Sequence, residues 1–301
     1  MGDQFTPRLG VRPEYPPLRT IVLKSLKPYV RDCFFAFLIL SVVKPIDPGH
    51  LGERLCFTLG TGLVHSLALV VTALPLCVCD KFALLSQFKL PRKTSQLAPP
   101  SLLAALVGEV ALSHFVMVPL SSYLMYPMVK AFGMPAFTDA PVNIVRDVAI
   151  AHLCNDLGFY WAHRCLHSQL LYKHFHKKHH VFTGTIGPSA EFATVIEVIF
   201  SHMLPTFVGC VVVGSHVLVF WTWLFLRLKQ TFEEHSGYAF ANTWADTLLI
   251  AQPESAIEHD HHHAVNRGTF GALWLDYLCG TMDAFVAAGF YEGLGPTSAG
   301  S

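Results

Sequence analysis

The sequence predicts an all-α fold: an integral membrane helical bundle that carries a histidine-rich helical cap outside the lipid. Two observations predict it. Hydrophobic residues make up 52% of the 301 residues and charged residues only 14%, with a mean hydropathy of +0.43, whereas soluble domains carry about 25% charged residues. Histidines, in contrast, crowd into two polar stretches, residues 163–180 and 258–263. The formal net charge is zero, so no nucleic-acid partner is indicated.

The first thirty residues are predicted to form a polar N-terminal segment, 1–30. They are proline-rich and lack the short apolar core and small-residue cleavage site of a secretory leader, so we expect no cleavable signal peptide. Five basic residues lie in it: Arg8, Arg12, Arg19, Lys24 and Lys27. The eight cysteines are scattered without a CxxC pair, and we expect buried thiols rather than disulfides.

Residues 31–130 are predicted to form transmembrane helices. The stretch 33–43 would span roughly 17 Å of a hydrocarbon layer of about 30 Å. It therefore either lies in the interface or is lengthened by its flanks. The stretches 55–79 and 102–129 are long enough to cross.

Residues 131–301 are predicted to form the catalytic domain, which includes a membrane hairpin at 192–226. A helix cannot continue unbroken through Pro205, near the middle of that apolar stretch. A hairpin returns the chain to one face, so the two histidine stretches can meet there. The basic loop 80–101 and the basic N-terminus are both drawn to the cytosol. If 102–129 then crosses once, either one of these segments breaks the positive-inside rule or 33–43 does not cross.

The spacing of eight histidines predicts three helical modules that each direct imidazoles to a common point. Residues three and four apart share one face of a helix. Neutral imidazole is a common metal ligand, and eight exceed the four ligands of one tetrahedral zinc ion. The set suits two metal ions with open positions, of iron, copper or zinc. The modules are His163 with His167, His176 with His179 and His180, and His259 with His262 and His263.

This nitrogen-rich set beside an apolar interior indicates oxidation of a lipid by dioxygen. The HExxH signature of zinc proteases is missing. His65, His114 and His216 stand alone in apolar runs, and we expect them to be core or membrane histidines. His50 lies in DPGH and not in the HPGG of haem-binding cytochrome b5 modules, so we expect no fused electron carrier.

These motifs resemble the sterol desaturase and fatty acid hydroxylase superfamily, most closely its C4-methylsterol oxidase branch. The HxxxH and two HxxHH boxes correspond to the three modules above. Further matching stretches are YWAHRCLHSQLLYKHFHKKHH (160–180), the AEF…E stretch with Glu191 and Glu197, EEHSGYAF (233–240) and HDHHHAVNRGTFGALWLDYLCGTMD (259–283). The resemblance covers roughly residues 145–285.

The resemblance implies further components of the site. His235, in the HSGY motif, would join the metal set as its ninth histidine. The family also implies a non-haem iron pair, dioxygen, and electrons passed from NAD(P)H through cytochrome b5 and its reductase. The location that it implies is the endoplasmic reticulum membrane, with the active site facing the cytosol.

Three departures from the branch put the identity of the substrate in question. Ala239-Phe240-Ala241 stands where Asp, Phe and Pro usually follow HSGY. Thr194-Val195 replaces a usual His-Pro, and Thr269 replaces a usual Asn. The metal boxes themselves are intact.

Other residues are predicted to support the metals or line a lipid pocket. A metal-bound imidazole usually donates its second N–H to a carboxylate or a carbonyl. The candidate partners are Asp156, Glu191, Asp260 and Asp276, for which plain surface carboxylates are the alternative. The candidate pocket residues are Tyr160, Trp161, Phe192 and Trp274, for which ordinary aromatic packing is the alternative.

The sequence therefore predicts a membrane-bound non-haem di-iron monooxygenase that oxidises a sterol, at the C4-methyl group in sterol biosynthesis. A C5-sterol desaturase or a hydroxylase of another lipid remains open, because these enzymes share the histidine boxes. A membrane protein that binds metal without turnover is the alternative from another class.

Overall fold

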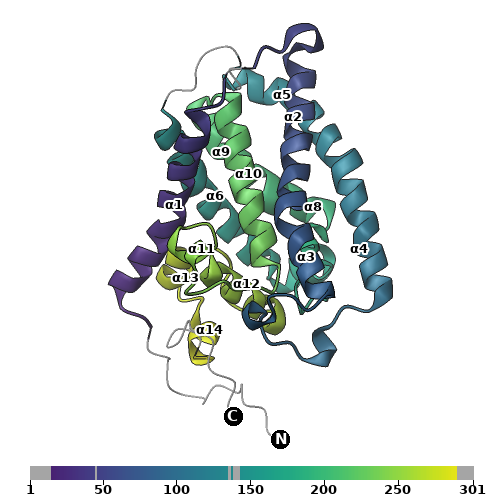
Figure 1. Cartoon of the computed structure of the whole chain (residues 1–301), viewed down its shortest axis with the longest axis vertical. Helices are drawn as coiled ribbons and strands as arrows, with labels where there is room; N and C mark the ends of the chain where they lie inside the picture. Colours follow the sequence, from purple (N-terminus) through teal and green to yellow (C-terminus); the bar gives the residue numbers. More distant parts are fainter. Residues whose placement is uncertain (1–14, 45, 135–136, 138–142, 290–301) are drawn as a thin grey trace, which may run out of the picture.

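A computed structural model of the chain describes residues 15–44, 46–134, 137 and 143–289. The described residues form helices and no strand, with one isolated bridge between Lys89 and Tyr238. Long helices stand side by side above a cap of short helices at one end (Figure 1). The predicted helical bundle and cap are confirmed. Residues 1–14 of the predicted N-terminal segment, with Arg8 and Arg12, lie outside the described residues.

Six columns of helix make up the bundle, and three of them contain π-helical turns. The columns are α1 (Leu18–Leu40); α2 (Gly52–Ala68), η2 (Leu69–Ala73) and α3 (Leu74–Lys81); α4 (Pro100–Leu112), η5 (Ser113–Met117) and α5 (Val118–Ala131); α6 (Ile144–Leu166); α8 (Val195–Glu197), η9 (Val198–Met203) and α9 (Leu204–Val213); and α10 (Val217–Glu234). The π-helical turns are η2, η5 and η9.

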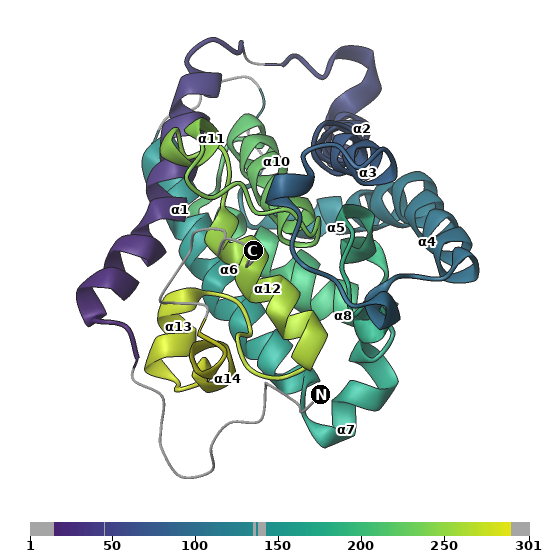
Figure 2. The same cartoon turned by 60° about the horizontal axis from the view of Figure 1, so that its bottom comes forward.

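The cap and its connections are short. The connections preceding the second and third columns include η1 (Gly49–Leu51), η3 (Ser86–Phe88) and η4 (Thr94–Gln96). The cap contains α7 (Gln169–Leu171), η6 (Tyr172–His176), η7 (His179–Val181), η8 (Gly187–Glu191), α11 (Trp244–Thr247), α12 (Pro253–Val265), α13 (Leu273–Leu278) and α14 (Asp283–Ala287). Turned to bring this end forward, α12 lies across the ends of the bundle helices (Figure 2).

Among the described residues, three helical stretches have the length and composition to cross a membrane: Gly49–Lys81, Thr94–Ala131 and Val195–Val213. Most of the short apolar stretch 33–43 lies in a longer helix. This agrees with one of the two expectations, that its flanks lengthen it. The longer helix is α1, whose 23 residues span roughly 35 Å. This helix begins at Leu18, inside the predicted N-terminal segment, and exposes Leu23, Leu26, Phe34 and Phe37.

The hairpin of residues 192–226 does not turn at Pro205, so that expectation is wrong. The helix continues through Pro205 to Val213, and the chain reverses at Gly214, whose φ of 61° lies in the left-handed region. A π-helical turn, η9, ends just before this proline. Such turns relieve the regular hydrogen-bond ladder that a proline cannot join.

Both basic segments and both histidine stretches lie at the cap end. Lys24 and Lys27 of α1 pair with Asp246 and Glu254 of the cap. Arg92, from the loop 80–101, pairs with Asp260 of α12. The expected conflict with the positive-inside rule does not arise, because α6 returns the chain to this end after α5 has left it (Figure 1). Helix α6 was not among the bundle helices predicted from the sequence.

Helix α10 is the central column of the bundle, and it packs against α1, α2, α6, α9 and α12. Its first two turns are buried. Glycines allow the columns to approach closely. A side chain at Gly60 of α2 would overlap the Trp221 ring, and a Cβ at Gly209 of α9 would lie 2.4 Å from the Ala151 Cα of α6.

The close approach of α6 and α9 predicts that Gly209→Ala destabilises the fold. The new methyl group meets backbone that cannot rotate away, and overpacking of this kind costs about 1–3 kcal/mol. Gly62→Ala is the control, because a Cβ there meets nothing within 4 Å. Thermal unfolding of the full chain in detergent should give a lower midpoint for Gly209→Ala alone. Equal midpoints for the two variants would contradict the packing described.

Candidate metal centre

All nine predicted histidine ligands converge under the bundle, where they form two groups. The first, here the five-histidine group, contains His163, His167, His176, His180 and His262. The second, the four-histidine group, contains His179, His235, His259 and His263. Within each group the candidate ligand atoms all lie within 4.8 Å of one another.

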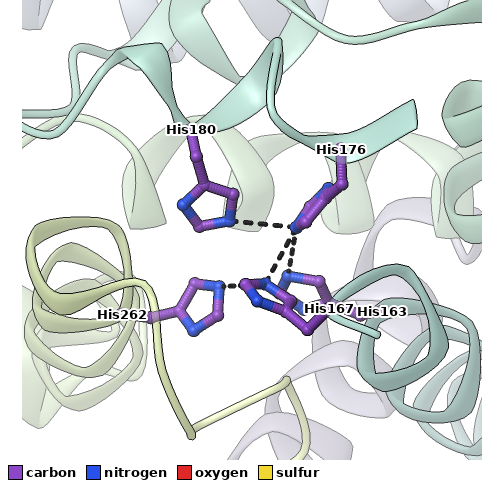
Figure 3. Close-up of side chains that lie close together, drawn as sticks. All are labelled: His163, His167, His176, His180 and His262. Carbon is purple, nitrogen blue, oxygen red and sulfur yellow. Dashed lines mark hydrogen bonds between the residues drawn. The ribbon is translucent and has the colours of Figure 1, made fainter. Parts of the chain in front are cut away.

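Their Nε2 atoms face inward in the five-histidine group (Figure 3). His176 Nε2 lies 3.1 Å from His163 Nε2, 3.0 Å from His167 Nε2 and 2.9 Å from His180 Nε2. His262 Nε2 lies 3.1 Å from His167 Nε2. The rings come from the end of α6, from the segment 176–180 and from α12.

The four-histidine group has the same construction. His235 Nε2 lies 3.3 Å from His179 Nε2 and 2.9 Å from His259 Nε2, and His263 Nε2 lies 3.1 Å from His259 Nε2. His235 is the residue that ends α10. The central column of the bundle therefore supplies one ring directly.

Each HxxHH box serves both groups, which the spacing alone did not predict. His176 and His180 belong to the five-histidine group, and His179 between them belongs to the other. In α12, His259 and His263 face the four-histidine group, and His262 faces the five-histidine group. The box at 176–180 is also not a regular α-helix, because a π-helical turn ends at His176 and a 3-10 turn begins at His179.

Hydrogen bonds fix the tautomer of five of the nine imidazoles. Backbone carbonyls accept from Nδ1 of His163 (Phe270 O, 2.8 Å) and His262 (Gly268 O, 2.6 Å). Carbonyls also accept from His235 and His263, and a carboxylate accepts from His176. A carbonyl only accepts, so the proton sits on Nδ1 and the lone pair on Nε2.

This tautomer tests whether metal ions fit. His163 and His176 both carry the proton on Nδ1, so two Nε2 lone pairs face each other 3.1 Å apart. Without a cation between them, that contact is repulsive. Nitrogens that share one ion at about 2.1 Å lie roughly 3.0–3.4 Å from each other. The observed separations match this, so both groups fit a transition-metal ion.

Burial keeps these imidazoles neutral, as metal ligation requires. Burial lowers the pKa of His235 to about 4. Burial, followed by the neighbouring His262 and His176, lowers the pKa of His167 to about 2. Burial also holds the pKa of His259 well below its usual value.

Glu197 contacts a candidate ligand directly, although it was not among the predicted partners. Its Oε1 accepts from His176 Nδ1 at 2.8 Å, and its side chain is buried. Thr194, at the position of the departure from His-Pro, accepts from the Glu197 N–H and caps α8. The AEF…E motif contains Glu197, so the signal was present, but spacing could not select it over Glu191.

Of the predicted carboxylate partners, Asp276 supports a candidate ligand indirectly, and Asp260 points away from the ligands. Asp276 accepts from the N–H groups of Phe270 and Gly271, and thereby braces the carbonyl that holds His163. Asp260 faces away from its neighbouring histidines, toward Arg92 and Thr185.

The other two predicted partners lie elsewhere. Asp156 accepts from Tyr29 and Trp274. Glu191 lies 3.0 Å from His114, whose ring stacks edge-on to His65. His65 and His114, each isolated in an apolar run of the sequence, therefore lie next to each other and beside Glu191 in the structure.

A cavity borders both histidine groups. Its lining includes His163 and His176 of the first group and His179, His235 and His259 of the second. Its other walls include the apolar Phe159, Leu224 and Leu228, and the polar Asn155, Glu197, Arg227 and Glu234. We call it the inner cavity.

A second cavity, the outer cavity, shares part of this lining. Phe159, Arg227 and His259 line both. The outer cavity continues to Lys24, Lys27 and Glu254 at the junction of α1 with the cap. The two cavities therefore lie next to each other, and the outer one extends to charged residues at the edge of the cap.

The predicted pocket residues differ from those observed. Of the four, only Trp274 lines one of these two cavities, the outer one. Tyr160 is buried and bonded to Thr281, Phe192 packs on Phe182, and Trp161 is half exposed on the surface. Thr269, one of the departures, lines the outer cavity.

Comparisons with known proteins agree with this architecture. A family model described as fatty acid hydroxylase matches residues 148–281. The very-long-chain aldehyde decarbonylase GL1-11 of Oryza sativa subsp. indica is 31% identical over 77% of this chain and 88% of its own length. A putative methylsterol monooxygenase of Dictyostelium discoideum is 30% identical over 90% of this chain and 94% of its own length. Methylsterol monooxygenase 2-2 of Arabidopsis thaliana is 28% identical over 77% of this chain and 88% of its own length. No solved structure matches.

The chain belongs to the fatty acid hydroxylase family of the sterol desaturase superfamily, and the resemblance seen in the sequence is confirmed. It is a membrane-bound, oxygen-dependent oxidoreductase with a lipid substrate. Its histidine groups are able to hold the metal on which the family's oxygen chemistry depends.

Glu197→Gln is predicted to weaken metal retention. The amide keeps the size of the side chain but removes the negative charge beside His176, and losing such a partner typically costs 10–100-fold in metal affinity. Metal bound per chain after dialysis against a graded chelator measures this. The control is Glu53→Gln, which changes a carboxylate on α2 that bonds Tyr126 and Lys130. Equal retention in both variants would show that the His176 contact does not support a metal.

Thr269→Asn is predicted to stabilise the fold. Thr269 has a φ of 46°, a region that β-branched residues avoid and asparagine tolerates. Its hydroxyl is also buried without a hydrogen-bond partner among the described residues. Relief of such strain is worth about 1 kcal/mol or more, so the unfolding midpoint should rise. An unchanged or lower midpoint would mean that the backbone here is not strained.

Proposed function

We propose that this protein is a di-iron monooxygenase that oxidises the C4-methyl group of a sterol. One observation carries the proposal: two separate groups of inward-facing imidazoles border one cavity. Nine nitrogen donors suit two redox-active ions better than magnesium or calcium, which prefer oxygen.

Iron bound in both groups would supply the reduction of dioxygen and the oxidation of an unactivated C–H bond. The chain's own residues supply binding and orientation. Carbonyls of Phe270, Gly268 and Thr231 hold Nδ1 protons, so each of these rings presents Nε2 in one fixed direction. Glu197 does the same for His176 and adds a negative charge behind the ring.

The inner cavity suits a lipid that carries a polar group close to the oxidised carbon. Phe159, Leu224 and Leu228 offer apolar contacts that exclude water. Arg227 and Glu234, whose charged atoms lie 3.8 Å apart, line the same space. In a 4-methylsterol the C3 hydroxyl is adjacent to the carbon that bears the methyl group, so this pair is positioned to bind it.

Electrons are proposed to come from NAD(P)H through cytochrome b5 and its reductase, at the cytosolic face of the endoplasmic reticulum. Support for the cytosolic orientation comes from charge. The basic segments around Lys24, Lys27 and Arg92 lie at the same end as the histidines, and such segments stay in the cytosol.

Decarbonylation of a very-long-chain aldehyde is the second candidate. It is favoured by the name of the rice relative, whose identity to this chain equals that of the methylsterol monooxygenases within a few per cent. A C5-sterol desaturase and a hydroxylase of another lipid use the same ligand set. A protein that binds metal without turnover would leave the inner cavity without a role.

The test uses the full chain in lipid nanodiscs, loaded with ferrous iron and supplied with NADPH, reductase and cytochrome b5. We expect two irons per chain and oxidation of 4,4-dimethylsterol, with no product from a sterol that lacks 4-methyl groups. Mass spectrometry of extracted lipids gives the products. Turnover of a very-long-chain aldehyde but not of the sterol would select the second candidate.

Histidine variants separate catalysis from metal storage. His179→Ala removes one ring of the four-histidine group and should reduce product formation at least about 100-fold. His174→Ala changes an exposed histidine of the same segment and should leave it unchanged. Product formation that survives in His179→Ala, or no oxygen consumption by the iron-loaded wild type, would contradict the proposal.

A further inference from the structure

A third cluster of metal-ligating side chains lies apart from the two histidine groups. It consists of His65 on α2, His114 in η5 and Glu191 at the end of η8. Their candidate ligand atoms lie within 4.8 Å of one another. Neither the inner nor the outer cavity is lined by any of the three.

The cluster is buried and already organised around His114. His114 Nε2 lies 3.0 Å from Glu191 Oε1, and His114 Nδ1 lies 2.8 Å from Ser66 Oγ. The side chains of His114 and Glu191 are 6% and 9% exposed. The rings of His65 and His114 are 4.6 Å apart, centre to centre.

Two polar atoms of this cluster have no hydrogen-bond partner among the described residues. They are His65 Nδ1 and Glu191 Oε2, and both are buried. A simple ion pair between His114 and Glu191 leaves both atoms without a partner. A buried polar group without a partner destabilises the fold. A cation shared by the three residues gives each of them one.

The helix geometry adds a separate observation. His114 lies within the π-helical turn η5, and His65 lies in the last turn of α2, which leads into the π-helical turn η2. Such turns interrupt two membrane-spanning helices at the level of the cluster, and they occur frequently at functional sites. Ionisable groups within membrane spans are rare and generally have a function.

We propose that His65, His114 and Glu191 bind a third metal ion, a zinc ion. Two imidazoles and one carboxylate form a ligand set that zinc accepts. Ser66 accepts the Nδ1 proton of His114 and directs Nε2 at the ion, as partners of metal-bound imidazoles do.

The position of this ion gives it a structural role. Glu191 ends η8, which packs against α3, α4, η2 and α10. The same segment begins at Phe182, whose carbonyl holds His263 of the four-histidine group. An ion at Glu191 therefore connects one end of the segment 182–191 to two membrane-spanning helices. The other end, at Phe182, contacts the metal centre through His263.

A catalytic Ser66–His114–Glu191 relay is the competing reading of these contacts. It requires substrate to reach Ser66, and neither cavity beside the histidines is lined by that residue. It also gives His65 no role. The metal site uses all three buried groups.

The test measures total transition metal per chain after the full protein has been equilibrated with Zn²⁺ and desalted. Glu191→Gln and His65→Gln are expected to bind one equivalent less than the wild type. His50→Gln, which changes an exposed histidine at the start of the same span, should bind as much as the wild type. Equal metal content in all four proteins overturns the proposal.

A second measurement needs no variant and so does not depend on how the variants fold. Zinc-edge anomalous diffraction from the Zn²⁺-equilibrated wild type should give a peak that contacts His65, His114 Nε2 and the Glu191 carboxylate. Peaks in the two histidine groups with none at this position overturn the third site and leave the proposed function standing. A peak at this position with none in the two histidine groups supports the third site and overturns the proposed function.

Discussion

The repulsion between imidazole lone pairs is the constraint on which the rest of this structure depends. His163 and His176 each give their Nδ1 proton to a fixed acceptor, so their Nε2 atoms meet 3.1 Å apart without a proton between them. Protonation does not relieve this repulsion, because burial holds the pKa of His163 well below its usual value. The arrangement is favourable only around a cation. The bundle, the cap and the carbonyls behind the rings all serve to hold the nitrogens in this geometry.

The fold meets this constraint by bringing helix ends to one place. The last residues of α6 and α10 provide His163, His167 and His235, and α12 crosses beneath them with three more rings. Each HxxHH box then joins the two groups, because its residues three apart point to different groups and its residues four apart point to the same group. The apolar columns above leave the inner cavity between α6 and α10, so a substrate in it would lie beside the histidines where the bundle joins the cap.

Much of this could be predicted from the sequence, and the failures have physical causes. Composition predicted the membrane bundle, and spacing together with the family resemblance selected the nine histidines that converge. Spacing could not assign them to two groups, because His179 and His180 are adjacent in sequence and face different centres. Pro205 misled because a π-helical turn accommodates it. Asp156 and Glu191 misled because proximity in sequence does not fix where a carboxylate points, whereas Glu197, six residues beyond Glu191, contacts His176.

The central claim is that the two histidine groups hold two iron ions in different surroundings. Mössbauer spectroscopy of the protein loaded with ⁵⁷Fe, together with iron-edge X-ray absorption, tests it most directly. The account predicts two distinguishable iron environments in equal amounts, each with mainly nitrogen neighbours. A single environment, or a shell dominated by oxygen, would contradict it.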